Sequence, residues 1–451
     1  MASTRLTRTN SGSATLVTKG TISLWFKMTD TLTGGSDRWL IGQYTDSNAH
    51  FYIYLRNDQS IGFYQKEGGS TQFSYISTKK FRDTSAWYHL VLAWDTSVST
   101  ATDRTKIYIN GERITSWATQ TNIPQNYGLR IADARAQYIG GVSGYGTHFD
   151  GLMSHVYYAD GTQYEPTVFG STDATTGEWK INTSPSFTPG NHGFTILKDG
   201  NTITDQSTNS NDWSLQSGTL TNTKDCPSNV FCTLNNLIST VPTAGTNSGT
   251  TGTFTNGNLT WTSTNAVWNS RGSGNMFVDT GKFYWETKMN TGGDFNAYIG
   301  ISPTTTVHEY FDGTMKKAGN FGYYKSGTKM IGTSASSYGD AWVAGDIIGT
   351  ALDATNSKLY FSKNGVWQNS GDPTSGSTGT GAIPIDANTL YTPRCTIHNM
   401  GMSFNFGTGF FGTTAITTNS NNGYAGAEGA SKFNYSVPTG YSALNTKGLN
   451  Q

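Results

Sequence analysis

Charged residues are scarce in this chain of 451 residues. They make up 13% of the sequence, and 30 lysines and arginines balance 30 aspartates and glutamates to a net charge of zero; an average soluble domain has roughly 25% charged residues. The basic residues are scattered, whereas a nucleic-acid binder needs a basic stripe to displace the counterions of the phosphates. We therefore expect no nucleic-acid partner.

Long apolar runs and cysteines are also scarce. No apolar run approaches the ~20 residues that span a bilayer, and the opening segment MASTRLTRTNSGSATL lacks the apolar stretch of a signal peptide. We expect neither membrane insertion nor secretion by the ordinary route. The three cysteines, Cys226, Cys232 and Cys395, form no CxxC pair. We expect buried or partly buried free thiols, and pairing of Cys226 with Cys232 remains open.

Aromatic residues and turn-forming residues are abundant instead. Aromatics make up 13% of the chain, and 54 glycines accompany many Thr, Ser and Asn residues. The segments 21–28, 51–57 and 87–95 alternate with a period of two, which is typical of half-buried strands. Asn110-Gly111 and Asn364-Gly365 supply the residues with positive φ that a tight hairpin requires. These patterns predict an all-β protein.

A change of composition divides the chain. Residues 171–255 are rich in Thr, Asn, Ser and Gly and poor in apolar side chains, with GFTILKDG (193–200) as one probable exception. A long irregular stretch inside one compact domain is uncommon. We therefore predict a domain over 1–170, a connector with one or two extra strands over 171–255, and a second domain over 256–451.

The first domain resembles a known family. The segments GTISLWFKM, FRDTSAWYHLVLAWDTSVSTATDRTKIYINGERI, YIGG and FDGLMSHVYYADG are similar, in order and spacing, to the laminin-G-like/concanavalin A-like sandwich. The resemblance covers residues 3–170. It implies two antiparallel sheets packed face to face in a jelly-roll-like sandwich, with sugar or protein ligands held by loops along one rim.

The second domain resembles another family. GKFYWETKM, AYIGIS, GDIIGTALDATNSKLYFSKNG and the closing FNFG are similar to the SPRY domain over residues 255–445. This implies a second antiparallel sandwich. The sequence departs from the family in Gly-rich insertions at 370–382 and 411–431 and around 303–340, so the ligand of the family is not carried over.

The succession of the two domains resembles surface proteins of tailed bacteriophages, particularly marine ones. That resemblance implies a chain made in the host cytoplasm and carried on the virion surface, reaching the outside by lysis. It implies other virion proteins and a host-surface glycan or protein as partners, and a homo-oligomer as the assembly state. Capsid and tail locations both remain open.

Motifs for catalysis are missing from the sequence. A glycanase needs two carboxylates about 5–9 Å apart across the glycosidic bond, yet the closest acidic pair, Glu309 and Asp312, would face opposite sides of a strand. HExxH, GxSxG and phosphate-loop motifs do not occur. We expect no enzymatic activity; acids distant in sequence could still converge, so a polysaccharide depolymerase remains an alternative.

Loops rich in Tyr, Trp, Asn, Ser and Gly make recognition surfaces, because aromatic faces stack on sugar rings and polar groups bond their hydroxyls. The segments 36–50, 140–151, 308–313 and 334–342 have this composition. The ligand-binding residues predicted from them are Trp39, Tyr44, Asp46, Tyr145, Tyr310, Asp312 and Trp342. The alternative for each aromatic is a place in the core, which we expect for Trp25, Trp87, Trp94, Trp285 and Trp367.

No cofactor is expected, with calcium as the one alternative. Hard cations prefer clustered carboxylate and carbonyl oxygens, and Asp46, Asp133 and Asp150 lie in loops that could meet on one rim. The competing interpretation is that these residues form turns, as Asp-Gly pairs commonly do. The sequence thus favours an adhesive virion protein that recognises glycan, with a purely structural virion component as the alternative.

Overall fold

The computed structural model describes residues 4–29, 35–142, 148–198, 202–235, 252–263, 270–306, 318–417 and 431–449. The chain divides into two compact units, unit 1 (Met1–Asn222) and unit 2 (Thr223–Gln451). Within the described ranges the one α-helix is the four-residue α1 (Thr446–Leu449), and none of the described helices could span a membrane. The predicted all-β fold is confirmed.

Unit 1 contains an eight-stranded antiparallel sheet with the order β10-β6-β5-β4-β3-β11-β1-β16. Its strands are β1 (Arg5–Thr9), β3 (Arg38–Asp46), β4 (Ala49–Leu55), β5 (Ile61–Glu67), β6 (Ser70–Ser77), β10 (Trp117–Thr121), β11 (Ala136–Ile139) and β16 (Ser214–Ser217). The first strand of the unit, β1, pairs with its last strand, β16. Unit 1 therefore begins and ends side by side.

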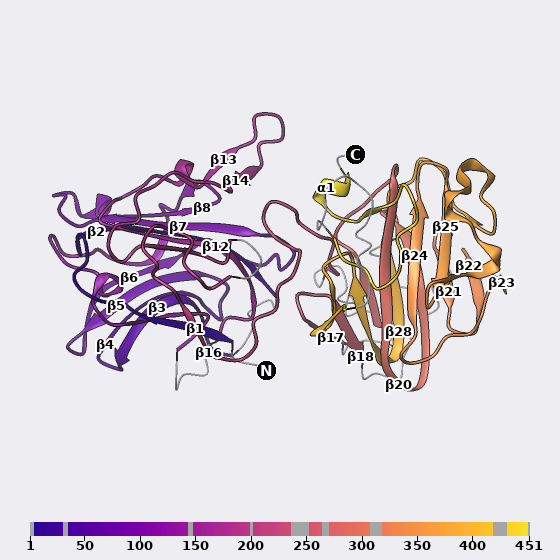
Figure 1. Ribbon diagram of the computed structural model, residues 1–451, viewed down its shortest axis with the longest axis horizontal. Helices are drawn as coiled ribbons and strands as arrows, with labels where there is room; N and C mark the ends of the chain where they lie inside the picture. The colour runs from indigo at the N-terminus through magenta and orange to yellow at the C-terminus, as the bar shows by residue number, and fades with distance from the viewer. Residues whose placement is uncertain are drawn as a thin grey trace. The chain divides into compact units, whose positions relative to one another are not determined.

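A six-stranded sheet lies face to face with the first (Figure 1), in the order β15-β12-β2-β7-β8-β9. Its strands are β2 (Lys19–Met28), β7 (Tyr88–Asp95), β8 (Thr105–Ile109), β9 (Glu112–Arg113), β12 (Gly151–Asp160) and β15 (Phe194–Ile196). The hairpin of β13 (Gly170–Thr172) and β14 (Trp179–Ile181) lies beyond this sheet in Figure 1. The tight turn between β8 and β9 uses Asn110 (φ 50°) and Gly111 (φ 80°), as predicted.

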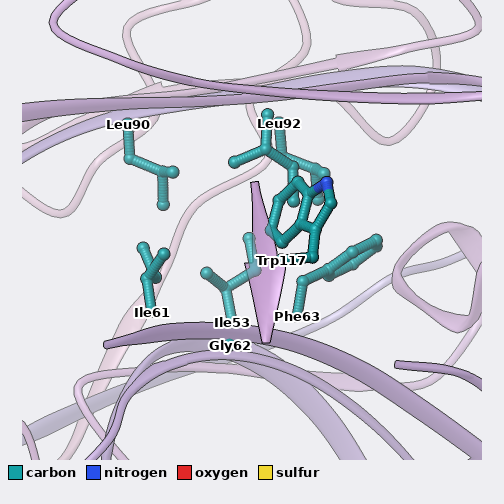
Figure 2. Close-up of a pocket in the computed structure, with 8 residues that line it drawn as sticks. Ile53, Ile61, Gly62, Phe63, Leu90, Leu92 and Trp117 are labelled. Carbon is teal, nitrogen blue, oxygen red and sulfur yellow. The ribbon is translucent and has the colours of Figure 1, made fainter. Parts of the chain in front are cut away.

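The inward positions of both sheets form one apolar core. Every second residue of β4, for example Phe51 and Ile53, faces it, and Trp94 is fully buried there. Figure 2 shows Leu90 and Leu92 from one sheet meeting Ile53 and Ile61 from the other. The gap among them is apolar and has room for about one water molecule at most. It is a packing gap and too small for a ligand.

The segment expected as a connector, 171–255, is divided between the two units. β15 pairs with β12, β16 pairs with β1, and Trp213 is buried in the first core. Unit 1 thus extends to Asn222, whereas Phe231 and Leu234 are buried in the core of unit 2. A few apolar residues of this polar segment decide its placement, because Phe194, Ile196 and Trp213 are used in one core and Phe231 and Leu234 in the other.

Unit 2 is built on two long strands, β20 and β28, which pair with each other through two register shifts. The start of β20 pairs with β24 and its end pairs with β21. The strands of this sheet are β17 (Gly252–Thr255), β18 (Thr260–Ser263), β19 (Ser270–Ser273), β20 (Lys282–Pro303), β21 (Phe321–Tyr324), β22 (Thr328–Ile331), β23 (Ser334–Ser337), β24 (Ile347–Asp353), β25 (Lys358–Lys363), β26 (Val366–Trp367), β27 (Ile383–Pro384), β28 (Tyr391–Asn405) and β31 (Ser442–Ala443). A separate small hairpin joins β29 (Phe410–Phe411) to β30 (Thr414–Ala415).

The predicted hairpin at Asn364 and Gly365 is confirmed between β25 and β26. Short 3-10 helices complete the described elements: η1 (Ala101–Asp103), η2 (Arg130–Ala132), η3 (Pro166–Val168), η4 (Gln368–Ser370) and η5 (Pro373–Thr378). Four of the five tryptophans expected in the cores, Trp25, Trp87, Trp94 and Trp285, are buried, and Trp367 packs against the core while partly exposed. All three cysteines are free.

The beginning and the end of unit 2 are joined. Phe231 forms a β-bridge with Asn445, and the Cys232 amide donates a hydrogen bond of 2.9 Å to the Leu444 carbonyl oxygen. The Val230 amide donates a bond of 3.0 Å to Thr446 Oγ1. This clasp closes unit 2 as the β1–β16 pair closes unit 1.

Candidate binding face on the eight-stranded sheet

Aromatic side chains gather on the outer face of the eight-stranded sheet, because successive residues of a strand point to opposite faces. In β4, Phe51 and Ile53 point into the core, and Tyr52 and Tyr54 point outward. The outward aromatics, here called the aromatic face, are Trp39, Tyr44, His50, Tyr52, Tyr54, Tyr64 and Tyr138. They come from β3, β4, β5 and β11, which are neighbours in the sheet.

The pairing register arranges these side chains in rows across the strands. The central row runs through Tyr138, Gly42, Tyr52 and Tyr64, which are partners in successive strand pairs. Rows of partners on one face bring side chains within about 5 Å of their neighbours. The aromatic face is therefore a continuous layer of rings.

Four of the seven rings are linked by stacked contacts with nearly parallel planes. The centroids of Trp39 and Tyr52 are 4.1 Å apart at an interplanar angle of 20°. His50 stacks on Tyr52 at 5.3 Å and on Tyr44 at 5.9 Å. Tyr64 lies tilted 5.4 Å from Tyr52. Tyr54 instead meets Tyr52 edge to face, with centroids 4.8 Å apart at 73°, and the Tyr64 hydroxyl lies 2.9 Å from Thr71 Oγ1.

Two glycines make room for this layer. A Cβ atom at Gly62 would overlap the ring of Tyr54, and a Cβ at Gly42 would meet the backbone oxygen of Phe51 and Cβ of Tyr52. The Tyr54 ring therefore lies across Gly62, on the neighbouring strand. Glycine is used at these two positions because the sheet surface must admit a ring or a close backbone.

The aromatic face has a buried base and a partly exposed surface. Trp39 is 6% exposed and Tyr54 7%, and both pack with Val142, whereas Tyr44, Tyr52, Tyr64 and Tyr138 are partly exposed. Tyrosine hydroxyls both donate and accept hydrogen bonds, and aromatic side chains lose little conformational entropy on binding. The face can therefore recognise an amphipathic ligand without a large ordering cost.

His50 is neutral at pH 7 within this layer. Burial lowers its pKa from the ordinary 6.5, and the positive charge of Lys66 acts in the same direction. Its Nδ1 lies 3.1 Å from the Asp46 carbonyl oxygen, which only accepts, so Nδ1–H donates. The Nε2 atom is then left as an acceptor in the aromatic face.

Charged side chains form a rim at the Asp46 end of β3. Arg130 is buried and bonds Glu67 and, at 2.8 Å, Thr45 Oγ1. Arg135 pairs with Asp133 at 3.4 Å. These cations are already neutralised by carboxylates of unit 1. The rim therefore holds loops together and presents no concentrated charge.

The outer face of the six-stranded sheet differs, because later residues of unit 1 cover it. Trp179 of β14 stacks on His89 at 6.0 Å, and its Nε1–H donates a bond of 2.9 Å to His89 Nδ1. Phe169 and Phe187 pack on Tyr157 of the same face. This coverage leaves the aromatic face as the sheet surface of unit 1 on which exposed aromatics gather.

The structure brings two of the predicted binding residues together. The ring centroids of Trp39 and Tyr44 are 6.3 Å apart in the aromatic face. Both residues lie on strand β3 and not in a loop, and Asp46 is exposed at the end of the same strand. Tyr145, Tyr310 and Asp312 lie outside the described residues.

The prediction for Trp342 is wrong, because this residue is 1% exposed in the core of unit 2. Its amide donates to the Lys325 carbonyl oxygen at 2.9 Å, and its ring lies 6.2 Å from that of Tyr323. These contacts fold the segment back so that the ring points inward.

The three aspartates proposed for calcium are not brought to one place. Asp133 is linked through Arg135 to Thr45, beside Asp46. The Asp150 carbonyl instead accepts from Thr29, near His148, which bridges to the opposite end of β3 at Trp39. Because a strand rises about 3.3 Å per residue, the Trp39 and Asp46 ends of β3 are about 20 Å apart. Over the described ranges no group of three His, Cys, Asp or Glu residues could hold a metal ion. Calcium binding stays a prediction, for which the described residues offer no set of ligands.

Sequence reasoning missed five members of the aromatic face: His50, Tyr52, Tyr54, Tyr64 and Tyr138. A signal for three of them was present, because Tyr52, Tyr54 and Tyr64 alternate with apolar residues that face the core. The solvent-facing positions of a strand, which are usually polar, can also carry aromatic residues that form a binding surface. Tyr138 could be added only with the register of β11 against β3.

One buried carboxylate in unit 2 has a strongly altered pKa. Burial raises the pKa of Glu286 to about 6, against the donors that surround it. Glu286 accepts from the Asn434 and Tyr435 amides at 2.8 and 2.7 Å, and from Asn405 and Tyr284 side chains. The two amide bonds tie the segment 431–435 to β20, and the Asn405 bond joins β28 to the same carboxylate, so the geometry of Glu286 is that of a structural anchor.

Comparisons with known proteins agree with this architecture. Residues 3–168 match the family model described as the concanavalin A-like lectin/glucanases superfamily, and residues 282–408 match the SPRY domain. The chain is thus an all-β protein with a concanavalin A-like domain followed by an SPRY-like domain. Both family resemblances drawn from the sequence are confirmed. A search of the curated proteins gave no match.

Solved structures with related folds are similar to one part of the chain each. The SPRY domain of human HERC1 is 17% identical, with 34% of this chain and 91% of that chain covered and a TM-score of 0.26. A heptameric SAP-like pentraxin from Limulus polyphemus is 14% identical, covering 43% and 86%, with a TM-score of 0.28. A protein from Bacteroides ovatus, described as a candidate carbohydrate binder, is 16% identical, covering 49% and 60%, with a TM-score of 0.30.

Proposed function

We propose that the chain is a non-enzymatic surface protein of a tailed-bacteriophage virion that adheres to the host surface through the aromatic face. One observation carries the adhesive part. Trp179 and its neighbours cover the outer face of the six-stranded sheet, whereas Tyr44, Tyr52, Tyr64 and Tyr138 of the other sheet remain partly exposed. Exposed aromatic patches mark interaction sites.

The two domain types support binding as the activity, because lectin-like and SPRY-like domains are binding folds that take glycans or proteins. The virion location rests on the resemblance of the whole sequence to phage surface proteins. Many copies on one particle would offset a weak single site, since multivalency raises avidity by roughly 10²–10⁴-fold.

Adhesion is tested with the fluorescently labelled full-length chain and intact host cells. We expect saturable binding that Tyr52→Ala weakens, because Tyr52 is stacked between Trp39 and His50 at the centre of the aromatic face. The control is Tyr324→Ala, which removes a partly exposed, stacked tyrosine of unit 2. Equal binding by the wild type and Tyr52→Ala would reject the aromatic face as the adhesive surface. Antibody labelling of intact virions tests the location.

A structural role in the particle is the second candidate, and the strand edges favour it. β10, β16 and β23 each end the strand order of a sheet, and Ser334–Ser337 of β23 is exposed throughout. Exposed edges can pair with another chain. Under this proposal the isolated chain forms oligomers in light scattering and rebinds particles stripped of it. A monomer that does not rebind would exclude the role.

A further inference from the structure

Three neighbouring rows of the eight-stranded sheet carry the aromatic face, and they are almost free of charge. The central row continues beyond its tyrosines to Thr7 on one side and to Ser74 and Thr121 on the other. It holds hydroxyls and rings but no ionisable side chain apart from the tyrosines.

The two flanking rows have the same character. One runs through Tyr44, His50, Lys66 and Thr71, and the other through Trp39, Tyr54, Gly62, Ile76 and Thr119. Lys66 is the single charged side chain of the three rows, since burial keeps His50 neutral. Burial also raises the pKa of Tyr54, to about 12, so this phenol is uncharged as well.

This distribution of charge decides between ligand classes. Carboxylate and phosphate groups are bound by Arg and Lys, which supply charge-assisted donors. The cations nearest to the rim, Arg130 and Arg135, are already paired with Glu67 and Asp133. An acidic polymer would lose its hydration over the central row and would find few cations to pair with, such as Lys66 in a flanking row and Arg5 beside Val142. An uncharged ligand that is rich in hydroxyls and has apolar C–H faces matches the rows.

The dimensions of the central row set the size of the ligand. Tyr138 and Tyr64 are separated by three strand spacings, about 14 Å in total, since neighbouring strands lie about 4.8 Å apart. A sugar unit of an extended linear glycan is comparable in length to one such spacing. The ring-covered part of the row therefore accommodates about three units, and the flanking hydroxyls of Thr7 and Ser74 can meet a fourth or fifth.

From this geometry we infer that the aromatic face binds an uncharged, linear glycan that crosses the strands along the Tyr138–Tyr64 row. The inference rests on the proposed function and adds the class, the charge and the direction of the ligand. In this arrangement the hydroxyl groups of the partly exposed Tyr52, Tyr64 and Tyr138 bond the sugar hydroxyls, and their ring carbons contact the C–H groups between them.

The test uses immobilised oligosaccharides of two to six units and the full-length chain. Neutral series of glucose, mannose, galactose and N-acetylglucosamine are compared with uronic acid series of the same lengths. We expect at least one neutral series to be retained, with an affinity that rises from two units to about four and then levels off. The uronic acid series stay at background, and raising the salt concentration leaves the neutral signal unchanged because no ion pair is involved.

The Tyr64→Ala variant distinguishes a binding role from a structural one, since Tyr64 lies at one end of the row. We expect roughly tenfold weaker binding of oligomers of four or more units, little change for dimers, and a plateau reached one unit earlier. A merely structural effect would weaken all lengths equally. Tyr324→Ala is the matched control, and Tyr138→Ala repeats the test at the other end should Tyr64→Ala fail to fold.

Three outcomes would overturn the inference. They are a preference for the uronic acid series, an affinity that does not depend on length, and neutral binding that Tyr64→Ala and Tyr138→Ala leave intact. If the chain adheres to host cells through Tyr52, but neutral oligosaccharides are not retained and protease treatment of the cells abolishes adhesion, the ligand is a protein. The proposed adhesion then stands and the glycan inference falls. Absence of adhesion by the wild-type chain would reject the proposed function itself.

Discussion

The aromatic face depends on two glycines, Gly42 and Gly62, as much as on the rings themselves. Gly62 lies beneath the Tyr54 ring, and Gly42 occupies the central row beside Tyr52. Without a side chain at these positions, neighbouring rings can settle onto the sheet and stack. At the residue scale, the recognition surface is therefore sensitive to the addition of a single methyl group.

Gly62→Ala tests this dependence. The new Cβ would overlap the Tyr54 ring, which must then leave its place against Trp39 and Val142. We expect a loss of about 1–3 kcal/mol in the free energy of unfolding, which is typical of overpacking, together with weaker ligand binding. Urea unfolding measures the first effect. Ser74→Ala on the same face serves as the control, and equal stability of the two variants would contradict the account.

Glu286 gives unit 2 a defined dependence on pH. Burial raises its pKa from the ordinary 4.5 to about 6 in the folded state. The folded state therefore holds a proton between pH 6 and 4.5 that the unfolded state has released. The contribution of protonated Glu286 to the free energy of unfolding is fully present below about pH 4.5. It is lost as the pH rises through about 6, and the change is on the order of 2 kcal/mol.

The matching variant is Glu286→Gln, measured by urea unfolding at pH 7 and pH 5. We expect the variant to lose this part of the pH dependence. It should also be less stable at both values by about 1–3 kcal/mol, because its amide group faces the donors of Asn434 or Tyr435. An unchanged difference between the two pH values would show that another group titrates.

At the scale of elements, the hairpin β13–β14 decides which sheet of unit 1 is covered. Trp179 reaches His89 with both a stacked ring and a hydrogen bond, over Gly111 and Gly170, which leave room for the indole. Because the indole N–H can only donate, His89 Nδ1 must accept, and His89 Nε2–H then donates to Ser23 Oγ at 2.8 Å. This element thus fixes the tautomer of a buried histidine.

Trp179→Ala uncovers that histidine. Burial, with a smaller contribution from His155, lowers the pKa of His89 from 6.5 to about 3. With the indole removed, water reaches the ring and the pKa should rise toward 6.5. Histidine proton shifts in NMR would then show an additional titrating ring between pH 4 and 7. Lys180→Ala, on the same strand but exposed, is expected to leave the shifts unchanged.

The sequence predicted individual strands better than their neighbours. Alternation placed β2, β4 and β7 correctly, and the two Asn-Gly pairs placed their hairpins, because both signals are local. The row from Tyr138 to Tyr52 joins strands that are some ninety residues apart in the chain, and no local pattern sets that register. Trp342 does lie in a loop, but the sequence could not show that its ring is buried, since the burial depends on Lys325 and Tyr323.

At the scale of the whole molecule, the boundary between the units lies inside the segment that looked like a connector. Phe194 and Ile196 of β15, and Trp213 beyond it, are buried in the core of unit 1. Their polar surroundings hide this role, because a few apolar side chains among many Thr and Asn residues give no periodicity. The composition of a segment therefore does not reveal whether it closes a sheet.

Fragments test the boundary. We expect residues 1–222 and 223–451 each to fold, with a cooperative thermal transition. A fragment of residues 1–170 should be unfolded or aggregate, because it lacks four core side chains that are worth about 1.5–3 kcal/mol each. It also lacks β16, one of the two strands that pair with β1. Circular dichroism on heating makes the comparison. A stable 1–170 fragment would restore the boundary predicted from composition.

Both units begin and end at adjacent points, through the β1–β16 pair in one and the clasp of Phe231 with Asn445 in the other. A domain whose two ends lie close together can be inserted into a longer chain, or removed from it, without distorting the flanking segments. Such domains can be exchanged as whole units, and we expect each of them to tolerate circular permutation at its surface loops. Because each unit closes on itself, its insertion or replacement as a whole domain should leave the flanking chain undisturbed.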